Sequence, residues 1–368
     1  MDPTYRAKLI RQHNKFIGEH TSVQICGWTK KALRGEGACY KGKFYGIKSH
    51  RCVQMSPAVN FCDHDCVFCW RERNNSGFGK IDDPNTMTAR SIDAQRKLLS
   101  GFGGNDKVPK DKYEEACDPL HFAISLNGEP TYYPRLSEFI KDLKKKNLSS
   151  FIVTNGQLPD VLRKIEQPTQ LYLSLDAPNK ELYKEIDRPM RDDGWERVLE
   201  TLDLLKELRE AKKTRTVIRI TVIKGLNDHN PEEWAALIER AKPMFIEIKS
   251  YMHLGASRER LTQEHMPFHE DIIAFTKEIC KHCSYTIVSE HKPSRVCLLM
   301  EEENKDAPWR YIDFAEEKDV WKRGESKPLL EIDEAGEFVG CGGSNDESSD
   351  ELDDELTVEK AEKLIKIK

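Results

Sequence analysis

The sequence predicts an α/β protein whose core is a partial (βα)6 barrel, with an extension before it and a disordered acidic tail after it. Apolar strand candidates alternate with helical patterns through the middle of the chain, which is typical of βαβ units and a parallel sheet. There are six such units, too few for a closed eight-stranded barrel. The strand candidates lie at 52–59, 120–126, 150–154, 170–175, 216–223 and 244–249.

Helical patterns follow the strands in the expected order. They cover 134–146, 158–166, 194–211, 231–241 and 268–281. Two earlier helices are predicted, an amphipathic one over 4–17 and one over 91–99 that stops at Gly101 and Gly103. Residues 104–118 form a polar insertion in this prediction, and 21–51 show no clean periodicity. A short strand over 284–289 and a closing strand up to Met300 complete the barrel.

Length and composition bound the class of protein. The chain has 368 residues, 38% of them hydrophobic and 33% charged, which suits a soluble protein with a sizeable core. No apolar run is long enough to cross a bilayer, and the first residues lack a signal peptide, so we expect a cytoplasmic protein without a membrane partner. Eleven cysteines in such a chain favour reduced, metal-binding thiols over a disulfide framework.

Charge is distributed unevenly along the chain. Residues 1–52 carry 11 Lys and Arg against 3 Asp and Glu, a net +8, whereas 344–368 carry 4 against 9, a net −5. The basic segment predicts a phosphate-bearing partner, with a solvated surface as the ordinary alternative. We therefore expect four parts: a basic extension over 1–52, the barrel over 53–300, a wrapping segment over 301–340 and a disordered tail over 341–368.

One loop after the first strand carries three closely spaced cysteines. Cys62, Cys66 and Cys69 follow the spacing C-x3-C-x2-C. A [4Fe–4S] cluster normally takes four cysteines, so three leave one iron open. The alternative is a zinc knuckle with His64 as the fourth ligand, although zinc sites usually add a second, distant pair. The spacing resembles the signature of the radical S-adenosylmethionine (SAM) superfamily, which implies that SAM binds the open iron and is reductively cleaved to a 5′-deoxyadenosyl radical.

Polar residues suited to a ligand end four of the later strands, at the edge where sites of such folds lie. Ser174 and Asp176 alternate on one strand face, as do Arg219 and Thr221, while a Gly-rich motif begins at Asn127. The resemblance implies that this motif holds the amino group of SAM. The predicted cofactor-binding residues are Asn127, Gly128, Glu129, Thr154, Asn155, Ser174, Asp176, Arg219, Thr221 and Asn227.

A second set of cysteines, Cys26, Cys39 and Cys52, precedes the loop with the spacing C-x12-C-x12-C. Together with the stretch over 38–73, it resembles the tRNA-4-demethylwyosine synthase family of archaea and eukaryotes. The resemblance implies a second [4Fe–4S] cluster on these cysteines. It also implies a lyase that condenses N1-methylguanosine, beside the anticodon of phenylalanine tRNA, with two carbons of pyruvate. The chain lacks the N-terminal flavodoxin-like domain of the eukaryotic form, so a separate flavodoxin or ferredoxin is the expected electron donor.

Lys41, two residues after Cys39, is the predicted catalytic residue. A lysine with a lowered pKa can form a Schiff base with a ketone such as pyruvate, and the family resemblance points to the same lysine. The alternative is that Lys41, Lys43 and Lys48 contact tRNA phosphates. Two other functions stay open: a radical SAM enzyme with an auxiliary cluster acting on a small molecule or peptide, and a zinc-dependent RNA-binding protein.

Overall fold

A ten-stranded sheet forms the centre of the molecule. The structure, a computed structural model, describes residues 1–72 and 77–312. The predicted tail and the later part of the predicted wrapping segment, 313–368, lie outside the described residues. The strands are β1 (Lys15–Phe16), β2 (Ser22–Gln24), β3 (Cys52–Ser56), β4 (His121–Ile124), β5 (Ser149–Thr154), β6 (Gln170–Ser174), β7 (Arg215–Val222), β8 (Phe245–Ser250), β9 (Tyr285–His291) and β10 (Val296–Glu301).

Strand order confirms the predicted partial barrel. The sheet runs β1-β2-β3-β4-β5-β6-β7-β8-β10-β9. The six strands from β3 to β8 pair in parallel and in chain order, as the six βα units predicted. Antiparallel strands extend both edges: β1 and β2 beside β3, and the β9–β10 pair beside β8. The first strands of the basic extension therefore belong to the same sheet as the barrel.

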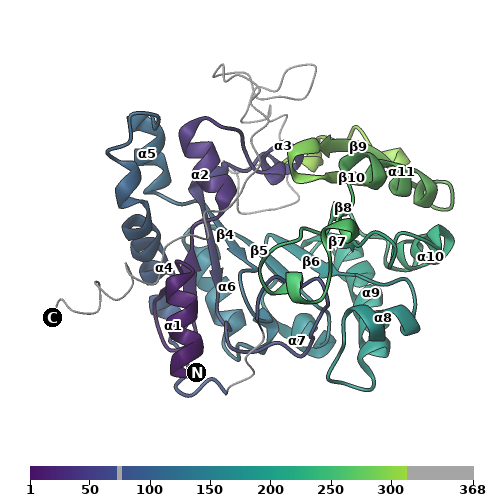
Figure 1. The fold of residues 1–368 in the computed structure, drawn as a ribbon, viewed down its shortest axis with the longest axis horizontal. Coiled ribbons are helices and arrows are strands. Elements are labelled where there is room, and N and C mark those ends of the chain that lie inside the picture. Colours follow the sequence, from purple (N-terminus) through teal and green to yellow (C-terminus); the bar gives the residue numbers. More distant parts are fainter. Residues whose placement is uncertain (73–76, 313–368) are drawn as a thin grey trace.

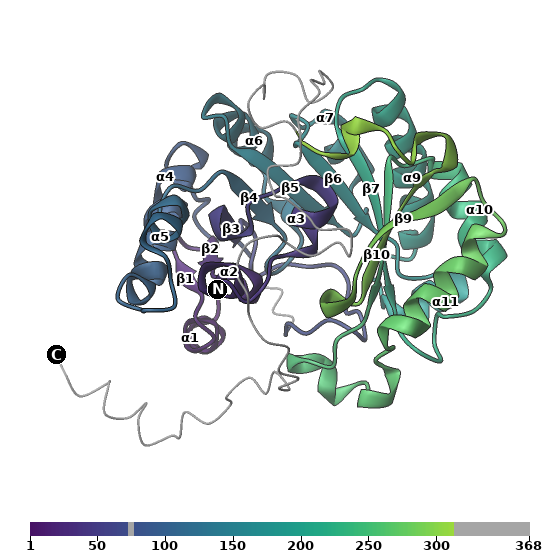
Figure 2. The ribbon, with the colours of Figure 1, turned by 90° about the horizontal axis from the view of Figure 1, so that it is seen from above.

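Helices lie on both sides of this curved sheet. They are α1 (Pro3–Arg11), α2 (Gly27–Arg34), α3 (Tyr40–Tyr45), α4 (Pro84–Leu99), α5 (Lys110–Ala116), α6 (Leu136–Lys145), α7 (Pro159–Lys164), α8 (Lys180–Ile186), α9 (Gly194–Glu210), α10 (Pro231–Ala241) and α11 (His269–Cys280). Figure 1 shows α11 near β9, and Figure 2 shows α4 and α5 near β1 and β2. In Figure 2 the helices α6, α7, α9 and α10 lie outside the arc of strands, while α3 lies inside it.

Three parts of the N-terminal third differ from the predicted elements. The helix predicted over 4–17 ends at Arg11, because His13 takes a positive φ of 62° and Lys15–Phe16 pairs with β2 instead. The polar insertion contains α5. The segment without periodicity contains α2 and α3, each of which ends at a glycine in the left-handed conformation, with φ of 74° at Gly35 and 81° at Gly46.

The strands bury side chains on both faces, in two separate layers. Because side chains alternate along a strand, Ile152, Leu171 and Ile218 pack outward against the helices. Their neighbours on the inner face form a second core with α3; its members from the sheet are Phe151, Tyr172, Val217, Phe245, Val296, Leu298 and Met300. This inner core fills one end of the barrel and leaves the other end for a site.

The last described residues close the filled end of the barrel. The buried Arg215 guanidinium donates to the carbonyl oxygens of Trp309 (2.7 Å) and Arg310 (2.6 Å). The amide of Ile312 donates to the Tyr45 carbonyl oxygen at 3.0 Å. Within the described part of the chain, none of the helices has the length and apolar character needed to cross a membrane.

Candidate functional site

The loop with Cys62, Cys66 and Cys69 follows β3 and is fixed by backbone hydrogen bonds. The amide of Val67 donates to the carbonyl oxygen of Ile186 at 2.8 Å, and the amide of Met190 donates to that of Asp63 at 2.8 Å. The loop therefore pairs with residues 186–190, at the end of α8, and its conformation does not depend on the cysteines alone.

A glycine after β4 lets a second backbone segment approach this loop. Gly128 has a φ of +65°, and a Cβ added there would lie 1.8 Å from the Ala58 carbonyl oxygen and 2.6 Å from that of Phe61. The next amide, of Glu129, donates to the Phe61 oxygen at 2.7 Å. Only glycine combines this conformation with this approach.

We expect Gly128→Ala to destabilise the protein by about 2–5 kcal/mol, from the left-handed conformation and the clash with Ala58. The matched control is Gly104→Ala, because a Cβ there meets no heavy atom within 4 Å. Thermal unfolding of both variants measures the difference. Equal unfolding temperatures for the two variants would show that the approach at Gly128 is not a constraint.

A cavity of about 410 Å³ opens beside the loop. All three cysteines line it, together with five of the ten predicted cofactor-binding residues: Asn127, Gly128, Ser174, Arg219 and Thr221. The remaining lining comes from the loop itself, from residues 125–126 after β4, and from residues 249–254, which include the last two residues of β8 and the segment that follows it. The structure thus brings the cysteines and half of the predicted residues to one surface.

The other five predicted residues lie outside the cavity lining, in two hydrogen-bonded groups, and only Asn155 of the five is partly exposed. The Asn155 side chain donates to Asp63 Oδ1 of the cysteine loop at 2.7 Å. Glu129 accepts from the hydroxyls of Thr131 (2.6 Å) and Thr154 (2.8 Å) and from the amide of Asn155 (2.9 Å). Burial raises the pKa of its carboxyl, and these hydrogen bonds oppose that change. Glu129 therefore ties the loop after β4 to the end of β5.

Asp176 and Asn227 connect the end of β6 to the end of β7 in a similar way. The Asp176 carboxylate accepts from the Thr221 amide at 3.0 Å, and Asn227 donates from its side-chain nitrogen to the carbonyl oxygen of Asp176 at 2.8 Å. Burial, with the negative charge of Asp187, raises the pKa of Asp176 to about 8. A direct contact of these five residues with a cofactor stays a prediction.

Burial makes the three loop thiols poor acids without a metal. It raises the pKa of Cys62, Cys66 and Cys69 above the ordinary value. The negative charge of Glu129 adds to this for Cys62 and that of Asp187 for Cys66, followed by the smaller effect of neighbouring cysteines. The thiolate is the form that binds metal. Three half-buried thiolates facing one cavity are stabilised by a bound cation, so this set of donors fits an iron–sulfur cluster.

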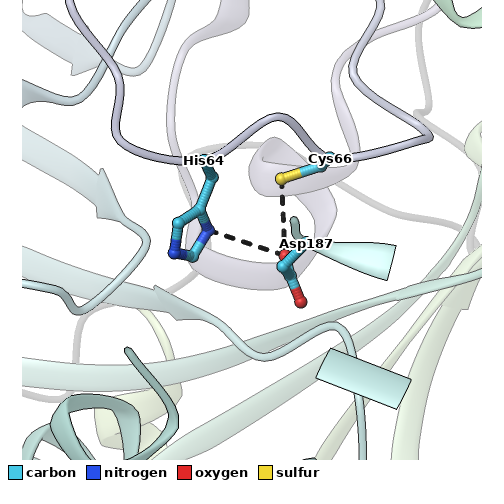
Figure 3. A group of neighbouring side chains, drawn as sticks. All are labelled: His64, Cys66 and Asp187. Carbon is cyan, nitrogen blue, oxygen red and sulfur yellow. Dashed lines mark hydrogen bonds and ion pairs between the residues drawn. The ribbon is translucent and has the colours of Figure 1, made fainter. Parts of the chain in front are cut away.

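His64 lies beside Cys66, as the zinc alternative requires, but the third residue of the group is Asp187 and not another cysteine of the loop (Figure 3). Its Nδ1 lies 3.7 Å from Asp187 Oδ1, and Cys66 Sγ lies 3.4 Å from the same oxygen. The ligand atoms of these three residues lie within 4.8 Å of one another, a group that does not include Cys62 or Cys69. His64 Nε2 contacts the Tyr183 hydroxyl at 2.9 Å, so the imidazole is held from both sides.

The second cysteine set lies on three different elements. Cys26 precedes α2, Cys39 precedes α3, and Cys52 begins β3. Burial, followed by the charge of Cys26, raises the pKa of both Cys39 and Cys52 to about 12. The same electrostatic argument as for the loop applies, and Lys41 supplies an opposing positive charge to both thiols.

Lys41 is buried on the inner face of the barrel. Its side chain is 9% exposed, and its Nζ lies 4.4 Å from the ring centroid of Tyr172 and 5.3 Å from that of Phe151. Its amine forms no hydrogen bond or ion pair with any residue in 1–72 or 77–312. Burial lowers the pKa of Lys41, the Glu247 carboxylate opposes this, and Arg219 lowers it further.

Two charged residues of β8 that the sequence analysis did not select complete this region. Glu247 is fully buried and accepts from the hydroxyls of Tyr40 (3.0 Å) and Tyr45 (2.8 Å), which fixes α3 against the sheet. Lys249 lines the cavity and donates to the Ser294 carbonyl oxygen at 3.0 Å. Burial and the Arg219 charge lower the pKa of Lys249 to about 8.

Strand register connects Lys41 with the cavity. Arg219 lies opposite both Ser174 and Glu247, and Thr221 lies opposite Lys249. Two residues earlier on the same strands, Tyr172 and Phe245 lie opposite Val217, in the aromatic core that contacts Lys41. The inner face is thus layered from an apolar end, through Glu247 and Arg219, to the cavity with the loop cysteines.

The basic segment is partly neutralised by acidic residues around α5. Lys48 and His50 contact the Glu115 carboxylate at 2.9 and 2.6 Å, and Arg51 contacts Asp118 at 2.6 Å. The excess positive charge counted in the sequence is therefore smaller on the surface. Binding of phosphates by this segment stays a prediction.

The barrel, the three-cysteine loop and the cavity at the strand ends define a radical SAM enzyme. Residues 56–238 match the family described as Radical SAM superfamily, and residues 240–301 match the one described as Wyosine base formation. The chain is 47% identical over 311 residues to the S-adenosyl-L-methionine-dependent tRNA 4-demethylwyosine synthase of Pyrococcus horikoshii, covering 82% of this chain and 90% of that protein. The chain belongs to this synthase family.

Other relatives and solved structures agree. The synthase of Methanocaldococcus jannaschii is 41% identical over 84% of this chain and 99% of its own length, and the human one is 38% identical over 85% of this chain and 43% of its own length. A structure of archaeal TYW1 has a TM-score of 0.69 and 37% identity, and one of TYW1 with a lysine–pyruvate adduct bound has a TM-score of 0.76 and 40% identity. Each covers 82% of this chain and 97% of the solved chain.

Family membership decides between the functions that the sequence left open. The protein is an enzyme that uses SAM and an iron–sulfur cluster in the formation of a wyosine base on tRNA. The prediction of this family is confirmed. The alternatives of a zinc-dependent RNA-binding protein and of a radical SAM enzyme for a small molecule or peptide were wrong.

Proposed function

We propose that this chain condenses N1-methylguanosine of phenylalanine tRNA with two carbons of pyruvate to form the tricyclic 4-demethylwyosine base. The observation that carries the proposal is the buried amine of Lys41, which lies on the inner face of the barrel close to Cys39 and Cys52. A structure similar to this one contains a lysine–pyruvate adduct. Lys41 is the buried lysine beside the Cys39 and Cys52 thiols that suits the same chemistry here.

Cys62, Cys66 and Cys69 hold the cluster in this proposal, and the predicted residues that line the cavity hold SAM. When bound, the cluster and SAM together supply a 5′-deoxyadenosyl radical. The chain itself encloses and orients these groups. Gly128 allows the loop after β4 to lie against the cysteine loop, and Ser174 and Thr221 line the cavity. Behind them, one group of hydrogen bonds around Glu129 and another around Asp176 and Asn227 hold the strand ends in place.

We assign Cys26, Cys39 and Cys52 to a second [4Fe–4S] cluster. Two of the three residues directly precede helices, where unpaired backbone amides favour negative charge. The Lys41 amide favours the Cys39 thiolate, because its hydrogen bond lowers the pKa of that thiol against the effect of burial.

Lys41 attacks the ketone carbon of pyruvate in this scheme. The unprotonated amine adds to the carbonyl, and loss of one water leaves an imine between Lys41 and the pyruvate carbon. Burial favours the unprotonated amine, and the Arg219 guanidinium provides positive charge for the pyruvate carboxylate. Contact with a tRNA phosphate, the alternative role for Lys41, fits poorly with a side chain that is 9% exposed.

A separate flavodoxin or ferredoxin is the proposed source of the electron for SAM cleavage. Pyruvate and this donor protein complete the reaction mixture that tests the function. The reconstituted enzyme, tRNA with N1-methylguanosine, SAM, reductant and pyruvate labelled with ¹³C at C2 and C3 are incubated without oxygen. We expect the modified nucleoside to gain both labelled carbons by mass spectrometry. A tricyclic product that contains no pyruvate carbon would contradict the proposed substrate.

A further inference from the structure

The mouth of the cavity carries exposed apolar side chains. The large hydrophobic residues exposed in the described part of the chain are Ile10, Trp70, Met190, Met252 and Phe268. Two of them, Trp70 (44% exposed) and Met252 (37% exposed), line the cavity. Single exposed hydrophobic residues are ordinary on a protein surface, but these two share the lining of one cavity, and apolar patches of that kind mark ligand-binding grooves.

One face of the Trp70 ring is already occupied. The Arg71 guanidinium carbon lies 3.4 Å from the ring centroid, and Arg71 is itself buried and donates to Gln24 Oε1 at 2.7 Å. This cation–π contact is fixed by a partner below the surface. The exposed area of the ring is therefore its other face and its outer edge, which remain for a flat ligand.

The backbone around Trp70 is held by hydrogen bonds from the segment after β8. The amide of Ala256 donates to the Trp70 carbonyl oxygen at 3.0 Å, and Arg260 donates to that of Cys69 at 2.6 Å. A Cβ on Gly255 would lie 2.3 Å from the Trp70 oxygen, so the two segments are in close contact. Ala256 and Arg260 lie within 240–301, the part of the chain that matches Wyosine base formation.

This origin of the contacts links the ring to the substrate. The cysteine loop serves SAM cleavage, whereas the segment that sets the position of Trp70 belongs to the region related to wyosine formation. Met252 and Leu254, from the same segment, add apolar surface to the same mouth. The Trp70 ring is held on one face by Arg71 and exposed on the other, and this segment sets its position. Such a ring suits recognition of the RNA.

We propose that Trp70 stacks on an unpaired tRNA base adjacent to the target guanosine. The inference rests on the proposed function, since the target base itself enters the cavity and its neighbour stays at the mouth. Proteins recognise unpaired RNA bases by stacking them on aromatic rings and on arginine. Trp70 and the Arg71 behind it supply such a platform, which fixes how deeply the target base enters.

The experiment uses the reconstituted full-length enzyme and an anticodon stem-loop RNA with 2-aminopurine, placed either directly before or directly after the target guanosine. We expect the enzyme to quench the fluorescence of one of the two RNAs by stacking. Trp70→Ala should abolish this quenching and weaken binding about ten- to hundredfold. Trp70→Phe should retain most of both. Phe268→Ala is the matched control, because Phe268 is an exposed aromatic beside Arg295 (5.1 Å) that does not line the cavity.

Iron content and RNA-independent SAM cleavage are measured for every variant, which separates stacking from loss of the cluster. If Trp70→Ala loses iron, Trp70→Met, which keeps the apolar volume without the ring, replaces it. Unchanged quenching and affinity in the iron-loaded variant would overturn the inference and leave the proposed function standing. An absence of quenching by the wild-type enzyme in both RNAs would overturn it too. The proposed function fails separately, if wild-type enzyme forms no tricyclic base on the methylated tRNA.

Discussion

Cys66→Ala should reduce SAM cleavage to the rate seen without enzyme, because the cluster loses one of its three protein ligands. The same result is expected for Cys62 and Cys69, which line the same cavity. The measurement is 5′-deoxyadenosine formed per enzyme after anaerobic reconstitution with a chemical reductant. Cys280→Ala is the control, because this half-buried thiol belongs to neither cysteine set.

Cys39→Ala should behave differently from Cys66→Ala. We expect it to stop formation of the modified base while SAM cleavage persists, uncoupled from product. This separation follows from the position of Cys39 at the start of α3, next to Lys41 and outside the lining of the SAM cavity. If Cys39→Ala keeps the iron of the first cluster and still cleaves no SAM, the proposed division between the two sets is wrong.

Lys41→Arg should lower formation of the modified base by about 10³-fold or more, the scale seen when a covalent nucleophile is lost. Arginine keeps the positive charge and the contact with the Tyr172 ring, but it does not deprotonate and forms no imine. The measurement combines product formation with borohydride trapping of labelled pyruvate, followed by peptide mass spectrometry. Wild-type enzyme should carry the label on Lys41.

The control for this substitution lies on the same helix. Lys43→Arg, two residues further along α3, should form product and trap label on Lys41 as the wild type does. Label trapped on Lys249, whose pKa burial also lowers, would assign the imine to that lysine instead. Full activity of Lys41→Arg, with no adduct on Lys41 in the wild type, would contradict the proposed Schiff base.

Much of the fold could be predicted because the signals are local. Each barrel strand carries its own apolar run, and α10 has the predicted bounds, 231–241, because Pro231 begins it and the apolar period is clear. The helices α2 and α3 left no such signal. They have eight and six residues, and α3 is held by contacts such as that between Tyr45 and Glu247, 202 residues apart in the sequence.

The candidate site was predicted in outline but not in detail. Strand ends and cysteine spacing pointed to one region, yet Glu129 and Asn227 bind neighbouring strands whereas Asn127 and Ser174 face the cavity. Asparagine and threonine occur in both groups, as Asn127 and Asn227 and as Thr221 and Thr154 show, so residue type alone could not separate them. Glu247 and Lys249 did leave a signal: two charges at alternate positions in the otherwise apolar strand F-I-E-I-K-S, which places both on the inner face.

The position of Trp70 could not be predicted either. The sequence shows an aromatic residue after Cys69, which equally suits shielding of a cluster. Its exposure and its contact with Ala256 depend on a segment 186 residues later. Long-range contacts of this kind decide whether a side chain serves the protein core or a substrate.

In the proposed reaction, the 5′-deoxyadenosyl radical removes a hydrogen atom from the N1-methyl group of the target guanosine. The origin of that hydrogen is the most direct test of the account. The tRNA substrate is prepared with a fully deuterated N1-methyl group on the target guanosine and incubated with the reconstituted enzyme, SAM, pyruvate and reductant. We predict that the 5′-deoxyadenosine formed gains one deuterium per turnover, together with formation of the tricyclic base. A tricyclic base formed alongside 5′-deoxyadenosine that contains no deuterium would contradict the account.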